Sequence, residues 1–547
     1  MSKNVNTLHN LVNLYLENLT EGNIRDGNLE FEIRFGTRRK YKKLTRINYE
    51  NVIKRLLFLD FKREQPEYFL RIISEYIDIN TGKTKFSNIR TNINGIHNIS
   101  NYCRNNNLKN ENGEFICNFE QKSYIKNSNN DTIYPVDYDD FNFRATLQLE
   151  RNIGSNSKLI KDMIDTWNDK IKMFRYINRC SLINDNYPVK IDVSIVKSSK
   201  ENVYKFLDSK LLEKEQEYEI EIELLRNKIG VGTKFDTVDK IIKALKEVIK
   251  IILSGIQSTN YPISIVEQET IKNEYMKILW HDDDQYNVYY QNKNIYPKNY
   301  VGPSSYTLQM ENIIPINENS TVPNINNNYT VTDKADGDRK LLFISSVGKI
   351  YLIDTNMNIQ FTGARTLNND NFNSILDGEH ILNDKKNNYI NLYAAFDIYY
   401  VNKKDVRNLK FTSNDTEILE TNLRFALLSK FIKNIDVTSI INNKKSPIRI
   451  EKKKFYLSNE TKNIFNGCNV ILNNIKNNLF EYNTDGLIFT PSNLAVGANN
   501  ENEISGKPLK KTWEHSFKWK PEEFNTIDFL VTIKKDERGE DLVQNLF

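Results

Sequence analysis

The chain has 547 residues, of which 39% are hydrophobic and 27% are charged, so it is long enough for about two to four folded domains. Its net charge of +5 excludes a strong overall basic field, so any affinity for nucleic acid must come from local patches. The four cysteines lack CxxC spacing, which favours a reducing compartment and argues against structural zinc. The sequence shows neither a signal-peptide pattern nor an apolar run of about 18 residues that could span a membrane.

The first recognisable strand follows an amphipathic helix that we expect over residues 8–19. Apolar and charged residues alternate with period two through residues 29–36, which places Glu30, Glu32 and Arg34 on one face of a strand. An ordinary half-exposed strand also explains this alternation.

The same pattern recurs at residues 218–224, where Glu219, Glu221 and Glu223 again share one strand face. Like charges roughly 6–7 Å apart along a strand stabilise nothing by themselves. A cation shared by the two acidic strands explains them better, and carboxylate oxygens suit Mg²⁺ or Mn²⁺.

Several strands with a polar face are expected between the two acidic strands. Their polar positions fall on alternate residues and include Arg90, Lys122, Arg144, Thr146, Gln148, Glu150, Arg175, Arg179, Lys190, Asp192 and Ser194. So many polar faces cannot all turn to water while the strands share a large core. A closed antiparallel β-barrel with a hydrophilic interior resolves this conflict, because its apolar side chains then point outward onto packed helices. One such helix is expected over residues 239–253, ended by Ser254 and Gly255. Acids for a metal and bases for phosphate inside the barrel would suit the hydrolysis of a polyphosphate.

These strands resemble the tunnel family of metal-dependent RNA 5′-triphosphatases. The resemblance rests on LEFEIRFG (29–36), RYINR (175–179), KIDVSIVKSS (190–199) and YEIEIEL (218–224). It implies that Glu30, Glu32 and Glu223 hold the metal, assisted by Glu219 and Glu221. It further implies a set of phosphate-binding bases (Arg90, Lys122, Arg175 and Arg179) and two tunnel acids (Glu150 and Asp192). Ile177 and Lys190 depart from the family pattern, which usually has lysine and arginine there, so we assign neither a catalytic role.

The second half of the chain is organised around residues 331–339, VTDKADGDR. We interpret Lys334 as a nucleophile, because a lysine amine attacks phosphorus when cations or burial keep it unprotonated. Asp336 could orient the amine or hold a metal ion, and Gly337 would let the backbone turn tightly. Arg339 could clamp a phosphate or a ribose hydroxyl. A surface Asp-Gly turn is the competing interpretation.

Four further motifs follow in order: LDGEH (376–380), AAFDIYY (394–400), TDGLIF (484–489) and FKWKP (517–521). Glu379 could hold the ribose or a metal, Phe396 could stack on a base, and Asp485 is a metal candidate. Lys518 and Lys520 share one strand face and suit an α-phosphate. The competing interpretations are another turn at residues 376–380 and a core position for Phe396.

Together with KADGDR (334–339), these motifs resemble the covalent nucleotidyltransferases, which include DNA ligases, RNA ligases and mRNA-capping guanylyltransferases. The resemblance spans residues 300–521 and implies a two-step reaction. Lys334 attacks the α-phosphorus of a nucleoside triphosphate and expels pyrophosphate, and the nucleotide then passes to a 5′ end. Positive charge from Arg339, Lys518, Lys520 and Mg²⁺ would activate the lysine and stabilise the transition state.

The first half of the chain decides which nucleotide and acceptor we expect. A triphosphatase that leaves a diphosphate RNA end makes the acceptor for a guanylyltransferase, whereas a ligase needs a 5′ monophosphate. We therefore expect a bifunctional mRNA-capping enzyme, resembling those of large nucleocytoplasmic DNA viruses, that uses GTP, Mg²⁺ or Mn²⁺ and the 5′-triphosphate end of nascent mRNA, and no membrane. The alternatives are an ATP-dependent polynucleotide ligase with an N-terminal nucleic-acid-binding barrel, and a degenerate binding module without turnover.

The expected fold class is α+β. The expected parts are an N-terminal antiparallel β-barrel, the triphosphate tunnel (1–255), an α+β nucleotidyltransferase domain (256–523), and the start of a truncated OB-fold (524–547). Only one strand of that OB-fold is expected, from Phe524 to Ile533, which favours a fragment of a longer protein. The resemblance implies a methyltransferase domain or a stimulatory subunit as a further partner, and the virion or the host cytoplasm (viral factory) as the location.

Overall fold

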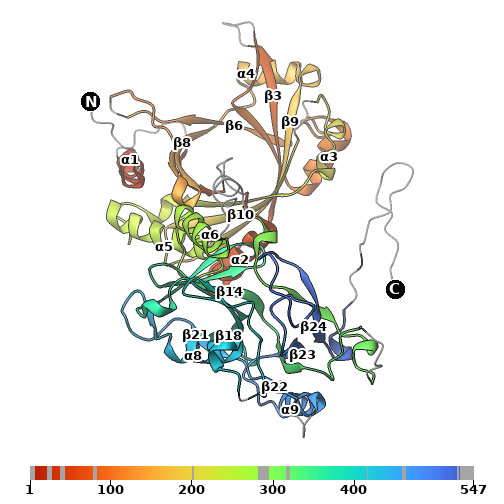
Figure 1. Ribbon diagram of the computed structural model, residues 1–547. Coiled ribbons are helices and arrows are strands. Elements are labelled where there is room, and N and C mark those ends of the chain that lie inside the picture. Colours follow the sequence, from red (N-terminus) through yellow and green to blue (C-terminus); the bar gives the residue numbers. More distant parts are fainter. Residues whose placement is uncertain are drawn as a thin grey trace. The chain divides into compact units, whose positions relative to one another are not determined.

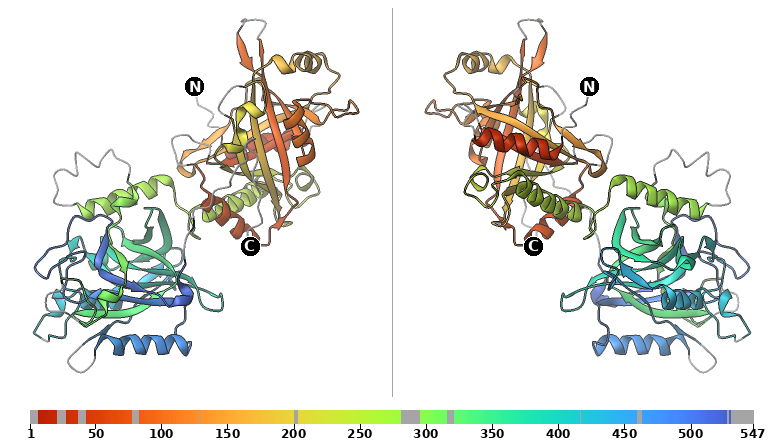
Figure 2. Two further views of the ribbon diagram at one scale, coloured as in Figure 1. Left: turned by 90° about the vertical axis from the view of Figure 1, so that its right-hand side faces the viewer. Right: turned by 90° about the vertical axis from the view of Figure 1, so that its left-hand side faces the viewer.

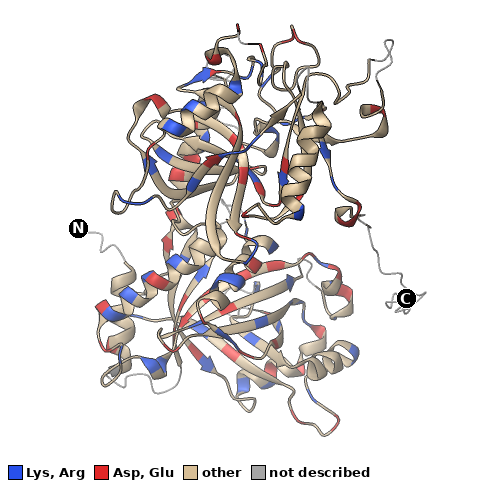
Figure 3. Ribbon diagram, turned by 90° about the horizontal axis from the view of Figure 1, so that it is seen from below, with Lys and Arg blue, Asp and Glu red and all other residues tan. Residues whose placement is uncertain are grey.

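The computed structural model describes residues 7–20, 28–36, 43–77, 83–127, 129–199, 203–280, 295–315, 321–415, 417–458, 463–526 and 529. The chain divides into two compact units, residues 1–269 and 270–547, and helix α6 (Ile265–Leu279) runs across the division. The domain boundaries expected after residues 255 and 523 stay predictions. Basic and acidic residues are interspersed in both units (Figure 3). In the part of the chain that is described, no helix is long and apolar enough to cross a membrane.

Eight strands of the first unit close into an antiparallel barrel within the described residues (Figure 1). Around the ring they are β1 (Asn28–Phe35), β8 (Phe143–Asn152), β6 (Cys117–Tyr124), β5 (Ile89–Asn94), β3 (Glu67–Ile77), β9 (Lys172–Ile183), β10 (Val189–Ser198) and β11 (Glu217–Leu224). The ring closes because β11 pairs with β1 and β3 pairs with β9. Three short strands extend it: β2 (Lys62–Arg63), β4 (Thr84–Phe86) and β7 (Val136–Tyr138). The predicted closed antiparallel barrel is confirmed.

The outward faces of the barrel strands are apolar and are covered by helices. Phe31 and Ile33 of β1 are fully buried in a core shared with α1 (Leu8–Thr20), α2 (Arg46–Phe58) and α5 (Val238–Ile256). Figure 2 shows α1 lying across the barrel strands. A second core, on β3, β5 and β9, includes residues of α3 (Ile96–Asn105) and α4 (Lys158–Asp165). The half-exposed interpretation of the first strand is therefore wrong, because its apolar face meets helices and its polar face is enclosed.

Gly255 lies inside α5, although we expected it to end that helix. The helix continues to Ile256, and Gly255 packs directly against α2. A Cβ atom at this position would lie 2.7 Å from Cγ2 and 2.8 Å from Cα of Val52. This glycine therefore permits the close crossing of α2 and α5 rather than a helix stop.

The second unit is built on two sheets. One has the strand order β12-β24-β23-β13-β22 and the other β19-β18-β17-β14-β15-β16-β20, with β21 beside β18. The first sheet contains β12 (Ser304–Thr307), β13 (Tyr329–Ala335), β22 (Tyr456–Leu457), β23 (Thr484–Pro491) and β24 (Thr512–Trp519). The second contains β14 (Asp338–Ile344), β15 (Lys349–Asp354), β16 (Ile359–Thr366), β17 (Ser374–Asn383), β18 (Tyr389–Val401), β19 (Lys404–Asp405), β20 (Val437–Ser439) and β21 (Arg449–Lys452). Helix α9 (Ile464–Lys476) packs on the first sheet and α8 (Arg424–Asn434) on the second. The expected α+β class is confirmed.

The OB-fold strand expected from Phe524 to Ile533 lies mostly outside the described residues. Phe524 itself ends a short 3₁₀ helix, Glu522–Phe524.

Replacing Gly255 by alanine should destabilise the first unit by about 1–2 kcal/mol, because overpacking against a backbone atom outweighs the gain in helix propensity. Urea unfolding measures the change. Gly154→Ala is the matched control, since a Cβ there meets nothing within 4 Å. Equal stability of the two variants would contradict the close crossing of the helices.

Candidate functional site

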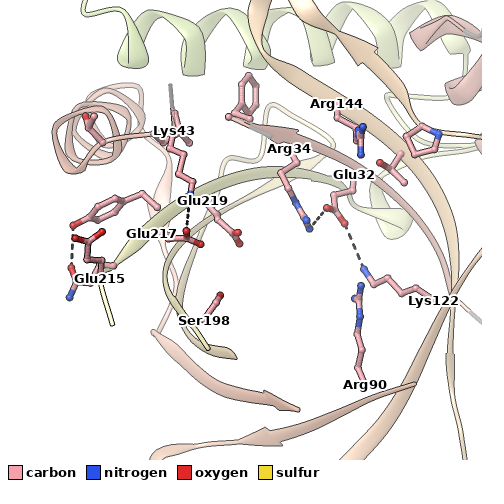
Figure 4. A pocket seen from close by; sticks show the side chains of 18 of the residues that line it. Glu32, Arg34, Lys43, Arg90, Lys122, Arg144, Ser198, Glu215, Glu217 and Glu219 are labelled. Carbon is pink, nitrogen blue, oxygen red and sulfur yellow. Dashed lines mark hydrogen bonds and ion pairs between the residues drawn. The ribbon is translucent and has the colours of Figure 1, made fainter. Parts of the chain in front are cut away.

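The barrel encloses a polar cavity of about 1020 Å³. Figure 4 shows Glu32 and Arg34 of β1, Arg90 of β5 and Lys122 of β6 pointing into it. The strand pleat places the predicted tunnel residues on this inner face: Glu30, Glu32, Arg90, Lys122, Glu150, Arg175, Arg179, Asp192, Glu219, Glu221 and Glu223. The structure thus brings together, in one lumen, acids and bases that are up to almost 200 residues apart in the sequence.

The carboxylates gather where β1 meets β11. Glu32 lies directly opposite Glu223 in the register, and Glu30 is the next residue on the same face of β1. Lys122 Nζ donates to Glu30 and lies 3.7 Å from Oε2 of Glu32. Burial raises the pKa of Glu30, against the opposing charge of Lys122. Burial and the nearby Glu221 raise the pKa of Glu32.

A divalent cation fits this donor set. Among the described residues no three carboxylates, histidines or cysteines are already arranged around a metal position. Here cationic side chains hold the carboxylates instead: Arg34 lies 2.5 Å from Glu32 and 2.7 Å from Glu221. Buried carboxylates with raised pKa values are those whose ionised form a divalent cation would stabilise most.

Strands β9 and β3 contribute arginines to the lumen. Arg175 pairs with Glu219, and Arg179 lies 3.2 Å from Asp192, yet the buried Nε atoms of both arginines have no hydrogen-bond partner. Arg71 of β3 also faces the lumen, and burial together with neighbouring arginines lowers its pKa to about 10. Unsatisfied donors and crowded positive charge are suited to binding phosphate oxygens.

Sequence reasoning missed Arg71 as a lumen residue. Arg71 lies on β3, a strand that the sequence analysis did not identify. The alternation of side chains along that strand could have placed Arg71 on its inner face. Lys190, to which we assigned no role, lies 2.9 Å from Glu223 and 3.6 Å from Asp192. Ile177 places a buried apolar side chain on the same lumen face as Arg175 and Arg179.

In the second unit, a β-bulge sets the environment of Lys334. The β13–β23 register shifts between Lys334 and Ala335, which leaves Asp485 as the extra residue and turns its carboxylate toward the lysine. Asp485 Oδ1 accepts from Lys334 Nζ at 2.7 Å, and its Oδ2 lies 2.7 Å from Lys520 Nζ. Burial alone would raise the pKa of Asp485, but the two lysines hold it below its usual value.

Gly486 makes this bulge possible. Its φ of 146° lies outside the range that other residues readily adopt, and a Cβ there would lie 2.0 Å from the Trp519 carbonyl oxygen. Lys518 lies in β24 and is exposed to solvent, whereas Lys520 follows the last residue of that strand. The structure therefore assembles Lys334, Asp485 and Lys520 and leaves Lys518 at the edge of the group.

Asp336 and Gly337 do not form a hairpin turn. They form an exposed bend that carries the chain from β13 in one sheet to β14 in the other, so the surface position of the competing interpretation is observed without the hairpin. A Cβ on Gly337 would lie 2.9 Å from the carbonyl oxygen of His380, so a residue with a side chain would clash at this position. Asp336 is exposed, and it is Asp485 that contacts the lysine amine.

Arg339 is held by a carboxylate that sequence reasoning overlooked. Its Nε donates to Asp377 at 3.1 Å, its Nη2 donates to the same carboxylate, and its Nη1 donates to the Pro303 carbonyl at 2.8 Å. Its guanidinium lies 5.6 Å from the Phe396 ring, which is only half-buried. The core interpretation of Phe396 is therefore wrong, and the role of Arg339 toward phosphate or ribose stays a prediction.

Glu379 lies within strand β17 rather than in a turn. Burial raises the pKa of Glu379 to about 7, against the opposing charges of Lys453, Arg339 and Lys334. Lys453 was not predicted, and no motif in the sequence marked it. It lies 3.0 Å from the buried Asp333, one residue before Lys334.

The raised pKa of Glu379 predicts a specific pH dependence of stability. The folded state binds more protons than the unfolded state between about pH 4.5 and 7, so the contribution of Glu379 is favourable below that window and is lost as the pH rises through it. Glu379→Gln should therefore gain about 2 kcal/mol relative to the wild type on going from pH 4.5 to pH 8. Denaturant unfolding of both proteins at both pH values measures this difference in the free energy of unfolding. The exposed Glu417→Gln should show no such change.

Comparison with known proteins finds relatives that are described as mRNA-capping enzymes. Residues 317–521 match the profile described as "mRNA capping enzyme, catalytic domain". A probable mRNA-capping enzyme of Acanthamoeba polyphaga mimivirus is 27% identical over 94% of this chain and 42% of its own length. An mRNA-capping enzyme of Danio rerio is 25% identical over 38% of this chain and 32% of its own length. The chain thus spans less than half the length of these relatives.

Solved structures similar to this chain include RNA triphosphatases. The mimivirus capping enzyme triphosphatase has 20% identity and a TM-score of 0.29, covering 44% of this chain and 97% of that one. The S. pombe RNA triphosphatase has 12% identity and a TM-score of 0.23, covering 46% of this chain and 89% of that one. With the viral relative aligned along nearly the whole chain, the resemblance to mRNA-capping enzymes of large DNA viruses is confirmed.

Proposed function

We propose that this chain carries out two consecutive steps of mRNA 5′ capping. The barrel removes the γ-phosphate of a 5′-triphosphate RNA end, and the second unit transfers GMP from GTP to the resulting diphosphate. The observation that carries the proposal is the presence, in one chain, of a lumen with facing acids and arginines and of a lysine held by a bulged aspartate.

In the barrel, Glu30, Glu32 and Glu223 would hold Mg²⁺ or Mn²⁺. The bound cation would supply positive charge next to the transferring phosphoryl group and so stabilise its oxygens. Neutralising the carboxylates would also release Lys122 and Arg34, which they hold in this structure, to face the phosphates. Arg175 and Arg179 offer buried donors without partners to the remaining phosphate oxygens.

In the second unit, Lys334 Nζ would attack the α-phosphorus of GTP after losing its ammonium proton. A phosphorus–nitrogen bond forms, the bond from the α-phosphorus to the bridging oxygen breaks, and pyrophosphate leaves. Lys520 and Asp485 position the amine, and Phe396 and Glu379 are suited to the base and the ribose. In the second half-reaction a β-phosphate oxygen of the RNA end takes the GMP and frees the lysine.

GTP is favoured over ATP by the product of the barrel. A diphosphate RNA end is an acceptor for GMP, whereas ligation consumes a monophosphate end. The matched relatives are described as capping enzymes, so the ligase alternative has no support among them. A methyltransferase partner and a location in the virion or the host cytoplasm belong to the same proposal.

Two variants should separate the two activities. Lys334→Ala removes the nucleophile, so it should abolish covalent labelling by GTP and leave phosphate release from 5′-triphosphate RNA unchanged. Glu32→Gln removes a metal ligand from the other unit and should lower phosphate release at least a hundredfold while labelling persists. Radiolabelled GTP and γ-labelled RNA measure the two steps.

Either variant serves as the folding control of the other. Labelling of the wild type by ATP alone would contradict the capping assignment. Loss of both activities in one folded variant would contradict the separation of the sites between the two units.

Metal dependence tests the carboxylate site directly. Chelation should stop phosphate release, and Glu223→Gln should raise the Mg²⁺ concentration at half-maximal rate at least tenfold. Glu17→Gln, an exposed glutamate on α1, is the control and should leave the metal titration unchanged. An unshifted titration in the Glu223 variant would remove this residue from the metal site.

A further inference from the structure

Two tyrosines face each other at the rim of the tunnel, and the proposed reaction uses neither. Tyr124 is the last residue of β6 and lines the cavity. The ring of Tyr134 lies 5.9 Å from it, with an angle of 55° between the ring planes. The two residues are 45% and 61% exposed, so they present aromatic surface to whatever occupies the rim.

The hairpin beyond β6 fixes their orientation. Ile133 N–H donates to the Ile125 carbonyl at 2.9 Å, and Lys126 forms an isolated antiparallel β-bridge with Thr132. Ile133 is buried in the core outside the barrel, and Ile125 packs against the same core. Tyr124 lines the cavity, so its side chain points away from that core, and the ring contact places Tyr134 beside it. Their exposure is therefore built into the hairpin and does not come from a loose loop.

The pair stands next to the proposed phosphate site. Tyr124 follows Lys122 by two residues on the same strand face, roughly 7 Å along the strand. Lys122 contacts Glu30 in the carboxylate group, and Arg144, held by Asp137 at 2.7 Å, also lines the cavity. If the phosphates of a ligand contact Lys122, the group attached to those phosphates would lie beside the two aromatic rings.

We propose that Tyr124 and Tyr134 stack the first base of the 5′-triphosphate RNA while its phosphates lie against Lys122. Unpaired bases of single-stranded RNA stack readily on aromatic side chains, and such stacking tolerates any base. The pair thereby selects an RNA end over a bare polyphosphate. This inference rests on the triphosphatase function proposed for the barrel.

The test compares a substrate that carries a base with one that does not. The double variant Tyr124→Ala/Tyr134→Ala should raise KM for 5′-triphosphate RNA about tenfold or more. Inorganic tripolyphosphate, measured as a substrate and as a competitor, should bind as it does to the wild type. Tyr124→Phe/Tyr134→Phe keeps the rings and should restore the wild-type KM for RNA.

Tyr204→Ala is the matched control, since Tyr204 is half-exposed in the first unit but does not line the cavity. This variant should leave both the KM for RNA and the binding of tripolyphosphate unchanged. An unchanged KM for RNA in the double variant, or equal losses for RNA and tripolyphosphate, would overturn the stacking proposal. A wild-type protein that releases phosphate from neither substrate would overturn the triphosphatase function itself, which is a different result.

Discussion

The charge balance inside the barrel is the constraint on which the first unit depends. Glu30 and Glu32 share the inner face of β1, where Lys122 pairs with Glu30 and Arg34 lies between Glu32 and Glu221 of β11. Without these cations the buried carboxylates would repel one another, and an enclosed charge without a partner is strongly destabilising. The same alternation that turns the acids inward turns Phe31 outward, so the barrel requires the helices that cover it.

The second unit positions Lys334, the proposed nucleophile, by backbone geometry instead. Its two sheets are joined through Asp336 and Gly337, and Lys334 stands at the end of a strand just before that crossing. The bulge at Gly486 then aims Asp485 at the amine, while Lys520 balances the second carboxylate oxygen. A single aspartate thus orders two lysines, whereas the barrel spreads its charges over eight strands.

The sequence allowed us to predict which residues share one face of a strand, but not which residues lie opposite each other on paired strands. Period-two alternation identified the inner residues of β1 and β11, yet only the structure shows that Glu32 lies opposite Glu223. Local motifs marked Lys334 and Asp485, but the bulge that joins them depends on pairing between distant strands. The pairing of Arg339 with Asp377 was missed for the same reason, because it joins residues of two different strands. Gly255 was misjudged because a close helix crossing and a helix stop call for the same residue type.

The carboxylates and the arginines of the lumen explain why a metal and a triphosphate would be bound together. In this structure the acids neutralise the cations, for example Lys122 with Glu30 and Arg175 with Glu219. A triphosphate alone would compete with those acids for the same cations and be repelled by them. A divalent cation held by Glu30, Glu32 and Glu223 would remove that competition and leave the basic side chains free for phosphate oxygens. In the proposed reaction, loss of the γ-phosphate would weaken the hold on the product and release the diphosphate end, which is the acceptor proposed for the second unit.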